Sequence, residues 1–178
     1  TEAMLAGQWG SWASGPLDSL TGQNKVTIEG WVKRDSLGTG VLSVSNQAFG
    51  IAANTTSTVV SLQSSSGLKT VQGLAIPSDG NFHHVAAVLD GTHPTKNLYL
   101  LMDGVVVSAS KLPGASTAIG GVANESNVYG VGQVAFEEIR ISNSARYTFN
   151  SQSKKNDHSI LAFWSRVRTF LNKRGVRL

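Results

Sequence analysis

The chain has 178 residues, of which 40% are hydrophobic and only 15% are charged, against about 25% charged residues in an average globular domain. The apolar share excludes an intrinsically disordered chain, and no apolar run approaches the roughly 20 residues of a transmembrane helix. There is no cysteine, which excludes disulfide bonds, thiolate zinc sites and cysteine nucleophiles. No basic region followed by an apolar run opens the sequence, so no signal peptide is expected.

The net charge of +4 is distributed unevenly. Residues 1–145 carry 7 Lys and Arg against 10 Asp and Glu, whereas residues 146–178 carry 8 Lys and Arg against one acid, Asp157. The basic character therefore belongs to the end of the chain, and the longer part is slightly acidic. Because nucleic-acid phosphates select basic surfaces, and the sequence has no aromatic and basic platform outside its basic end, we do not expect a nucleic-acid partner.

Short runs rich in Val, Ile, Leu and Thr, separated by Gly, Asn, Asp and Ser, follow one another from about residue 24 to residue 142. Such runs are typical of β-strands and the turns between them. The predicted strands are residues 26–33, 40–45, 49–53, 58–63, 68–73, 82–90, 98–102, 105–108, 127–131 and 134–142. No helix-length segment separates them, so parallel strands with crossover helices are not expected. The sequence predicts an all-β fold, an antiparallel two-sheet β-sandwich.

Two positions within these strands give more detailed predictions. Asp103-Gly104 separates two β-rich runs, and Asp-Gly tolerates the positive φ angles of a type I′ turn, so a β-hairpin is predicted there. Trp31 lies in the middle of the alternating run 26–33. We expect it in the core, where large aromatic side chains are most often buried.

The end of the chain has a different pattern. Residues 150–156 are polar and are predicted to be a linker, followed by a C-terminal amphipathic α-helix that begins near Asp157 or Ser159 and ends near Gly175. Apolar residues recur on one face of this helix and basic residues lie mostly off it. We expect the helix to be an anchor that packs on the sandwich or on a neighbouring subunit, with an anionic membrane surface as the alternative. The anchor residues are Phe163, Trp164, Arg166, Val167, Arg168, Phe170, Leu171, Lys173 and Arg174.

Four segments resemble signatures of laminin-G-like, concanavalin A-like lectin jelly-roll domains, in the order in which that family has them. They are residues 28–33 (IEGWVK), 82–86 (FHHVA), 98–104 (LYLLMDG) and 136–148 (FEEIRISNSARYT). The resemblance implies two curved antiparallel sheets packed face to face as a jelly roll. It also implies a binding or structural module, in some members with a calcium ion at the sheet rim.

The resemblance also suggests how the chain is organised. We expect an N-terminal segment (1–19), a jelly-roll domain (20–148), and a linker with a basic helical tail (149–178). The ending Ala145-Arg146-Tyr147-Thr148 resembles the form found in such domains of bacteriophage virion proteins and bacterial surface proteins.

The sequence contains residue types used in catalysis without the spacing that catalysis needs. Glu137 and Glu138 are adjacent, and neighbours on a strand point to opposite faces, whereas a glycosidase needs two carboxyl groups facing one another. Residues 130–135 match a dinucleotide-binding string, but a strand follows where that motif requires a helix. Nucleophile-elbow, P-loop, zincin and EF-hand motifs are absent from the sequence. We therefore expect no enzyme activity and no catalytic residue.

Metal binding has weak support in the sequence. His83 and His84 are adjacent and are expected on opposite sides of a strand, where they cannot share one ion, so both are predicted to be structural. No cofactor is expected, with Ca²⁺ at the rim as the one possibility left open. Its oxygen ligands would have to come from several loops. The candidate ligands for such an ion are Asp35, Asp79, Asp90 and Asn97.

The function predicted from these patterns is that of a non-enzymatic accessory module of a virion, such as a phage capsid decoration or appendage subunit. It would be located in the virion, join an oligomer with other virion or assembly proteins, and be anchored by its C-terminal helix. The alternative is a carbohydrate-binding lectin module of a secreted or cell-surface protein. Trp9, Trp12 and Tyr129 are the candidates for contact with a glycan, and packing at an edge or interface is the other interpretation of these aromatic residues.

Overall fold

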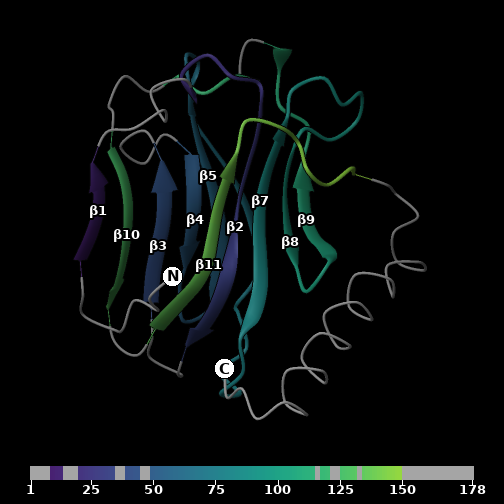
Figure 1. Cartoon of the computed structure of the whole chain (residues 1–178). Coiled ribbons are helices and arrows are strands. Elements are labelled where there is room, and N and C mark those ends of the chain that lie inside the picture. The colour runs from purple at the N-terminus through teal and green to yellow at the C-terminus, as the bar shows by residue number, and fades with distance from the viewer. Residues whose placement is uncertain are drawn as a thin grey trace, which may run out of the picture.

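The computed structural model describes residues 9–13, 20–34, 39–44, 49–114, 117–120, 125–131 and 134–149. In these residues eleven strands form two antiparallel sheets that pack face to face (Figure 1), which confirms the predicted all-β sandwich. The predicted C-terminal helix and its anchor residues lie outside the described residues. Within the described ranges, no helix is long and apolar enough to cross a membrane.

The sandwich is built from a six-stranded and a five-stranded sheet. In spatial order, the six-stranded sheet contains β1 (Trp9–Ala13), β10 (Glu125–Val131), β3 (Thr39–Val44), β4 (Phe49–Ala53), β5 (Ser57–Ser64) and β6 (Gly67–Leu74). The five-stranded sheet contains β11 (Val134–Ser142), β2 (Lys25–Arg34), β7 (His83–Asp90), β8 (Leu98–Met102) and β9 (Val105–Ser110). Every predicted strand is present, with ends shifted by at most two residues.

Alternate residues of each strand fill the space between the two sheets, as the two-residue period of a strand requires. In β2 these are Val26, Ile28 and Val32, all almost completely buried. Trp31 has the opposite parity, and the prediction that it lies in the core between the sheets is wrong. It lies half-buried on the outer face of β2, with its ring edge-on to the His84 ring at a centroid distance of 5.4 Å.

Strand β1 was not predicted from the sequence. Its sequence is Trp9-Gly10-Ser11-Trp12-Ala13. Three of the five residues are Gly, Ser or Ala and none is β-branched, so its local strand propensity is weak. The strand exists because it pairs with β10, with Trp9 opposite Tyr129. The hairpin at Asp103-Gly104 is confirmed: φ is 50° at Asp103 and 79° at Gly104, as a type I′ turn requires.

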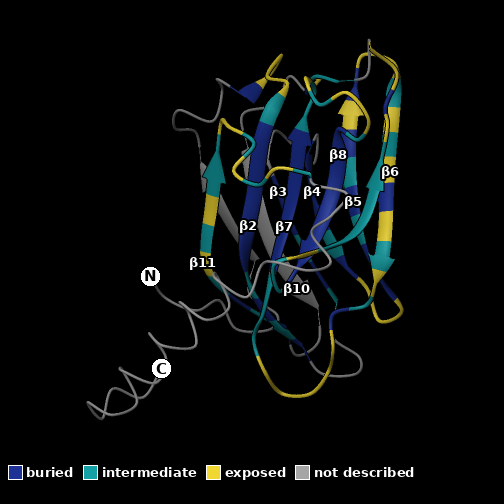
Figure 2. Cartoon of the chain, turned by 90° about the vertical axis from the view of Figure 1, so that its right-hand side faces the viewer, coloured by how far each residue is buried: buried dark blue, intermediate teal, exposed yellow. Residues whose placement is uncertain are grey.

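The two sheets approach each other closely where β6 crosses β8 and β9. A Cβ atom added at Gly73 would lie 2.8 Å from Cδ2 of Leu100 and 3.1 Å from Cγ2 of Val107. Glycine at this position therefore lets the edge strand β6 pack directly on the opposite sheet. In Figure 2 exposed residues are concentrated in loops and on the edge strands β6 and β11, and the inner strands are largely buried.

Residues 143–149, which we call the closing segment, cross the outer face of the five-stranded sheet after β11 ends (Figure 1). They cover a second apolar cluster, separate from the core between the sheets. Its buried members are Ala86, Val88, Tyr99 and Leu101, and Ala145, Tyr147 and Phe149 of the closing segment pack against them. The five-stranded sheet therefore has an apolar cluster on each face, one packed against the other sheet and one packed against the closing segment.

Candidate functional site

A buried carboxylate lies beneath the closing segment. The side chain of Glu29, in the middle of β2, is only 6% exposed. One carboxylate oxygen pairs with the Arg146 guanidinium, and the other accepts a hydrogen bond from the Tyr147 hydroxyl and lies 3.4 Å from Nε2 of His84. Because its charge is compensated and both oxygens are engaged, Glu29 has a structural role.

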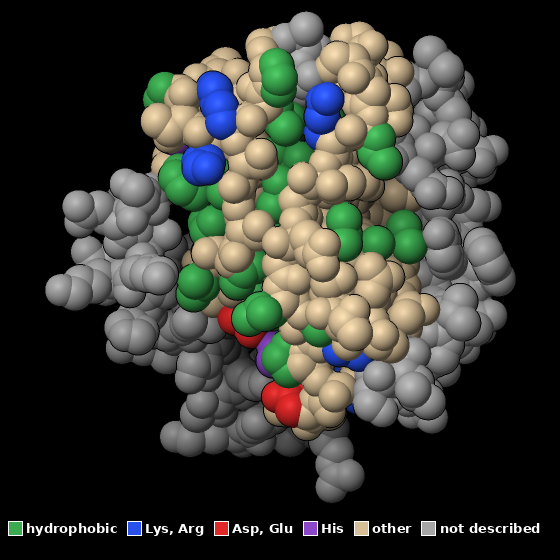
Figure 3. Space-filling view, turned by 180° about the vertical axis from the view of Figure 1, so that it is seen from behind, with side chains coloured by type: hydrophobic (Ala, Val, Ile, Leu, Met, Phe, Trp, Pro, Cys, Tyr) green, Lys and Arg blue, Asp and Glu red, His purple; other side chains and the backbone are tan. Residues whose placement is uncertain are grey.

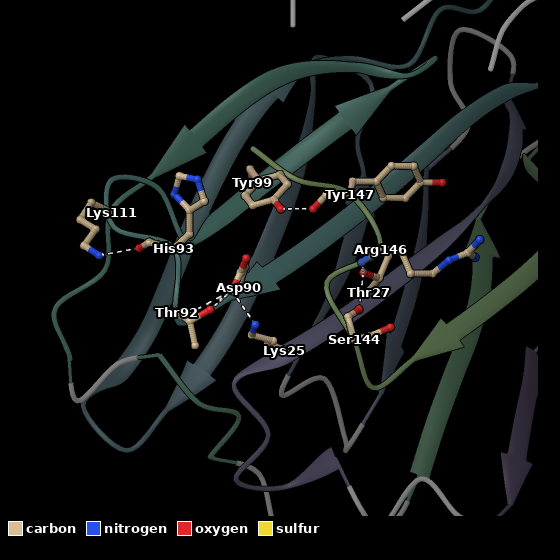
Figure 4. Close-up of polar contacts among 10 residues, drawn as sticks. All are labelled: Lys25, Thr27, Asp90, Thr92, His93, Tyr99, Lys111, Ser144, Arg146 and Tyr147. Carbon is tan, nitrogen blue, oxygen red and sulfur yellow. Dashed lines mark hydrogen bonds and ion pairs between the residues drawn. The ribbon is translucent and has the colours of Figure 1, made fainter. Parts of the chain in front are cut away.

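Further hydrogen bonds fix the closing segment to β2, to β8 and to the loop that contains His93, and Figure 4 shows the contacts with β2 and β8. The Thr27 hydroxyl donates to the Ser144 carbonyl oxygen at 2.8 Å and accepts from the Arg146 backbone N–H at 3.0 Å. The Tyr99 hydroxyl donates to the Tyr147 carbonyl oxygen. Nε2 of His93 lies 3.0 Å from the Phe149 carbonyl oxygen. These contacts join residues 48 to 119 positions apart in the chain.

The two tyrosines of this region remain protonated at neutral pH. Burial raises the pKa of Tyr99 to about 12. Burial also raises the pKa of Tyr147, against the opposing effect of the Arg146 charge. Both hydroxyls can therefore act as hydrogen-bond donors over the whole physiological pH range.

The adjacent histidines of β7 lie in different environments, as predicted from strand alternation. His84 faces Glu29 and Trp31 on the outer face, and burial lowers its pKa although the Asp103 and Glu138 charges oppose this. His83 lies between Asp103, at 2.8 Å from Nδ1, and Asp79, at 3.1 Å from Nε2. Burial of His83 favours the neutral form, but the hydrogen bonds and charges of the two carboxylates outweigh it and raise its pKa.

The two histidines are expected to titrate on opposite sides of the ordinary value of 6.5. A raised pKa means that charged His83 stabilises the fold below pH 6.5 and that this contribution is lost as pH rises through its folded pKa. A lowered pKa means that neutral His84 stabilises the fold above pH 6.5 and that this contribution is lost as pH falls through its folded pKa. Proton NMR titration of the imidazole signals, assigned with His83→Gln and His84→Gln, measures both; midpoints in the reverse order would contradict these environments.

Of the described candidate calcium ligands, Asp79 precedes β7 and Asp90 ends it, so the fold separates these two carboxylates, whereas the Asn97 carbonyl oxygen accepts from the Asp90 backbone N–H at 2.8 Å. Asp79 accepts a hydrogen bond from the Asn81 backbone N–H, which with other contacts lowers its pKa to about 2. Asp90 accepts from the backbone and hydroxyl of Thr92. Buried Asn97 accepts from the Leu112 backbone N–H at 2.6 Å. Asp35 lies outside the described residues, and within them no group of three His, Asp or Glu side chains could hold a metal ion.

The acidic pair on β11 lies at a β-bulge. The pairing of β11 with β2 shifts between Glu137 and Arg140, and Glu138 has a φ of 49°. Simple alternation, from which we argued that the two side chains point apart, therefore does not apply at this position. The bulge instead bends an edge strand and leaves Glu138 exposed and Glu137 half-buried.

Strands β3 to β6 of the six-stranded sheet have very little charge. From Thr39 to Leu74 the sequence carries one charged residue, Lys69, on four strands. In Figure 3, which looks at this side of the molecule, hydrophobic and uncharged polar side chains occupy the middle of the face, and charged side chains lie toward its ends. One row of directly opposed residues on this face is Val41, Ala52, Val59 and Gln72, and the next is Ser43, Gly50, Ser61 and Thr70.

The fold brings two of the three candidate glycan contacts to the same row. Trp9 is opposite Tyr129, and Tyr129 is opposite Val41, so both continue the row that crosses β3 to β6. Trp12 is opposite Ser126 instead. Because it follows Trp9 by three residues, strand alternation gives it the other parity. We call the two opposed rows, with Trp9 and Tyr129, the uncharged face.

Sequence reasoning missed the Glu29 cluster. In an alternating strand a glutamate is expected in solvent, and only the contacts with Arg146 and Tyr147, more than 115 residues away, explain its burial. The signal was present in the segments 28–33 and 136–148, which the resemblance picked out without giving a physical reason for them.

The described architecture, a two-sheet antiparallel sandwich whose own chain covers one outer face, defines a lectin-like jelly-roll domain. A laminin G family model, described as the concanavalin A-like lectin/glucanases superfamily, matches residues 7–148. The chain belongs to this superfamily. None of the curated proteins matches it in sequence.

Solved structures share the fold at low sequence identity. The binding domain of botulinum neurotoxin serotype G is 9% identical, with a TM-score of 0.58 over 93% of this chain and 45% of that one. Botulinum neurotoxin type C is 11% identical, with a TM-score of 0.54 over 82% and 44%. Domains LG4-5 of the mouse laminin α1 chain are 12% identical, with a TM-score of 0.51 over 78% and 44%. The chain thus spans less than half the length of these proteins, and the likeness shows the fold alone.

Proposed function

We propose that the domain is a non-enzymatic binding module that takes a neutral carbohydrate on the uncharged face. The observation that carries the proposal is the near absence of charge on four consecutive strands, in which only Lys69 is charged. Hydroxyl and amide side chains can pair with sugar hydroxyls, and small apolar side chains can pack on the C–H faces of a sugar ring. A neutral ligand also binds such a face without the cost of desolvating charged groups.

The aromatic positions of the row support this choice of ligand. Trp9 and Tyr129 are the residues proposed to contact the ring face of a sugar, since they continue the row of Val41, Ala52 and Val59. Large aromatic residues supply apolar area together with a polar group that hydrogen-bonds. Trp12, at a position of the other parity, is not expected to contribute.

The structural neighbours are consistent with binding of glycans or proteins by this fold. For botulinum neurotoxin type C, cell entry depends on interaction with two ganglioside molecules. A botulinum neurotoxin DC binding domain, 10% identical with a TM-score of 0.55, was solved in complex with rat synaptotagmin II. These ligands belong to those proteins. The proposal for this chain rests on its own surface.

The test is glycan binding by the full chain, on an array that carries both neutral and acidic glycans. We expect binding to neutral glycans and a loss of about tenfold or more in affinity for Val59→Lys, which places a charge in the middle of the uncharged face. Val105→Lys introduces the same charge at a 41% exposed position on the other sheet, and it should bind as the unmodified chain does. Binding restricted to acidic glycans, or equal binding by both variants, would overturn the proposal.

A second candidate function follows from the charge of the chain's end. We propose that residues 150–178 anchor the module to an assembly, with a virion as the narrower hypothesis and a cell surface as the alternative location. The supporting observation is that residues 146–178 carry 8 Lys and Arg against a single acid. Deleting residues 150–178 should leave a folded domain that no longer joins its assembly. A deletion variant that assembles normally would remove this candidate.

A further inference from the structure

The four edge strands of the two sheets differ in how well they are protected. An exposed sheet edge presents unpaired N–H and C=O groups, and proteins block such edges with bulges, charges, proline or short strands. β11 has a bulge and three charged residues, Glu137, Glu138 and Arg140. β9 has a register shift opposite Leu100 and Leu101, and β1 has only five residues.

β6 has almost none of these protections. All eight of its residues, Gly67–Leu74, pair with β5 in an unbroken register, and the strand contains no proline and one charge, Lys69. Lys69 is opposite Leu62, a core residue, so by alternation it lies at the core side of the sheet and leaves the outer side of β6 uncharged. β6 is therefore the long, regular and unblocked edge of the sandwich.

This edge also carries the most exposed large hydrophobic residues of the described chain. Leu74 is 76% exposed and Leu68 is 60% exposed, and Val105 at 41% is the third described residue of this kind. Thr70 and Gln72, between the two leucines on the same side of β6, are exposed as well (Figure 2). Singly exposed leucines are common on protein surfaces, but these two lie at the two ends of one long and regular edge strand, and this combination is the reason to consider a partner for the edge.

We propose that β6 pairs antiparallel with β6 of a second copy of this chain, about a two-fold axis at Val71. Leu68 and Leu74 are each three residues from Val71, so this register places Leu68 opposite the partner's Leu74 at both ends. Thr70 then lies opposite the partner's Gln72, and Lys69 lies opposite the partner's Gly73. The two exposed leucines cover each other, and the two lysines are not opposed.

The hydrogen-bond pattern of a strand is compatible with this register. In an antiparallel pair, alternate residues direct their N–H and C=O groups toward one neighbour, and the others direct theirs away. Leu68, Thr70, Gln72 and Leu74 form one alternating set, and Lys69, Val71 and Gly73 form the other. A two-fold axis at Val71 pairs members of a set only with members of the same set, as a ladder requires. The result is one continuous sheet of twelve strands, with the uncharged face doubled across it.

A second copy is the occupant that the strand itself favours. A two-fold interface must be self-complementary. On the outer side of β6 a leucine lies three residues to each side of Val71, with the uncharged residues Thr70 and Gln72 between them, and Lys69 lies on the other side. A strand from an unrelated protein would have no reason to match this spacing. The edge of another protein and a monomeric state are alternatives that the experiment below separates.

The experiment measures the mass of the full chain by sedimentation equilibrium from about 1 to 100 µM. We expect a reversible dimer. Leu68→Lys combined with Leu74→Lys would place like charges opposite each other, and we expect dimerisation to weaken by about tenfold or more. Leu68→Lys combined with Leu74→Glu would place opposite charges in contact in the proposed register, and the dimer should persist. Glu138→Lys, which adds positive charge at an exposed position on β11, at the opposite edge of its sheet from β9, is the control and should dimerise normally.

Each outcome decides the proposal. A monomer at the highest concentration, or a dimer that the double lysine variant leaves unchanged, would overturn it. Loss of the dimer in both double variants would exclude the register centred on Val71. Circular dichroism spectra of all variants establish that they are folded, and both leucines are exposed, so neither substitution disturbs the core.

Discussion

A chain that ends at Ser142 is expected to be unfolded, whereas a chain that ends at Phe149 is expected to keep its fold. The shorter chain lacks the closing segment, so the outer apolar cluster that includes Val88, Tyr99 and Leu101 would be exposed to water. It also leaves the Glu29 carboxylate without Arg146 and Tyr147. The deletion also uncovers Glu29, so its carboxylate becomes hydrated and the loss there is that of the ion pair and the hydrogen bond, about 1–3 kcal/mol. Exposing the large apolar side chains of the cluster costs about 1.5–3 kcal/mol each, and the total approaches the 5–15 kcal/mol by which a domain is stable.

The measurement is thermal and urea unfolding followed by near-ultraviolet circular dichroism, with the full chain as reference. The chain that ends at Phe149 is the matched control, because it lacks residues 150–178 but retains every contact described for the closing segment. Cooperative unfolding of the shorter chain, at a urea midpoint close to that of the control, would mean that the closing segment contributes little to stability.

The strands could be predicted from the sequence because each one depends on local information. A run such as residues 98–102 followed by Asp103-Gly104 contains both its strand and its turn, and the structure places them as predicted. β1 was missed because its own residues favour a strand only weakly, and its pairing with β10 joins residues more than 110 positions apart.

The burial of outward-facing residues could not be predicted in the same way. Period-two alternation divides β2 into two faces, but it does not say which of them a distant segment covers. Trp31 was expected in the core but lies on the outer face of β2, and Glu29, on the same face, is buried because the closing segment covers it. Likewise, the row that joins Trp9, Tyr129 and Val41 depends on strand register, and a slip of one residue would move each side chain to the other face.

The closing segment also bears on which surface can bind a ligand. The outer face of the five-stranded sheet is occupied by residues of the same chain, from Ser144 over β2 to Phe149 beside His93. Over the described residues, the uncharged face is not covered in this way, and its row from Val41 to Gln72 is at least partly exposed. Among the described residues the two outer faces therefore differ: the closing segment covers one, whereas Val41, Ala52, Val59 and Gln72 of the other are at least partly exposed, although Ser43 and Gly50 beside them are buried. This difference supports the proposed binding surface.

Arg146→Met is expected to lower the free energy of unfolding by about 2–3 kcal/mol, because it removes the cation that compensates buried Glu29 while keeping an apolar stem of similar length. The Arg146 side chain is 33% exposed, so solvent screens part of the interaction and the effect falls below that of a fully buried pair. Lys111→Met, which removes an exposed cation just after β9, three strands away from β2, is the control and should alter stability by less than about 0.5 kcal/mol.

A double-mutant cycle separates the charge interaction from lost packing. Glu29→Gln removes the charge and keeps an oxygen that can accept from Tyr147. In its presence, Arg146→Met has no buried charge to leave uncompensated, so the second substitution should cost at least about 1 kcal/mol less than it does alone. Urea unfolding of the four proteins gives this coupling energy directly. Additive effects would show that Arg146 stabilises the closing segment through its aliphatic stem and not through Glu29.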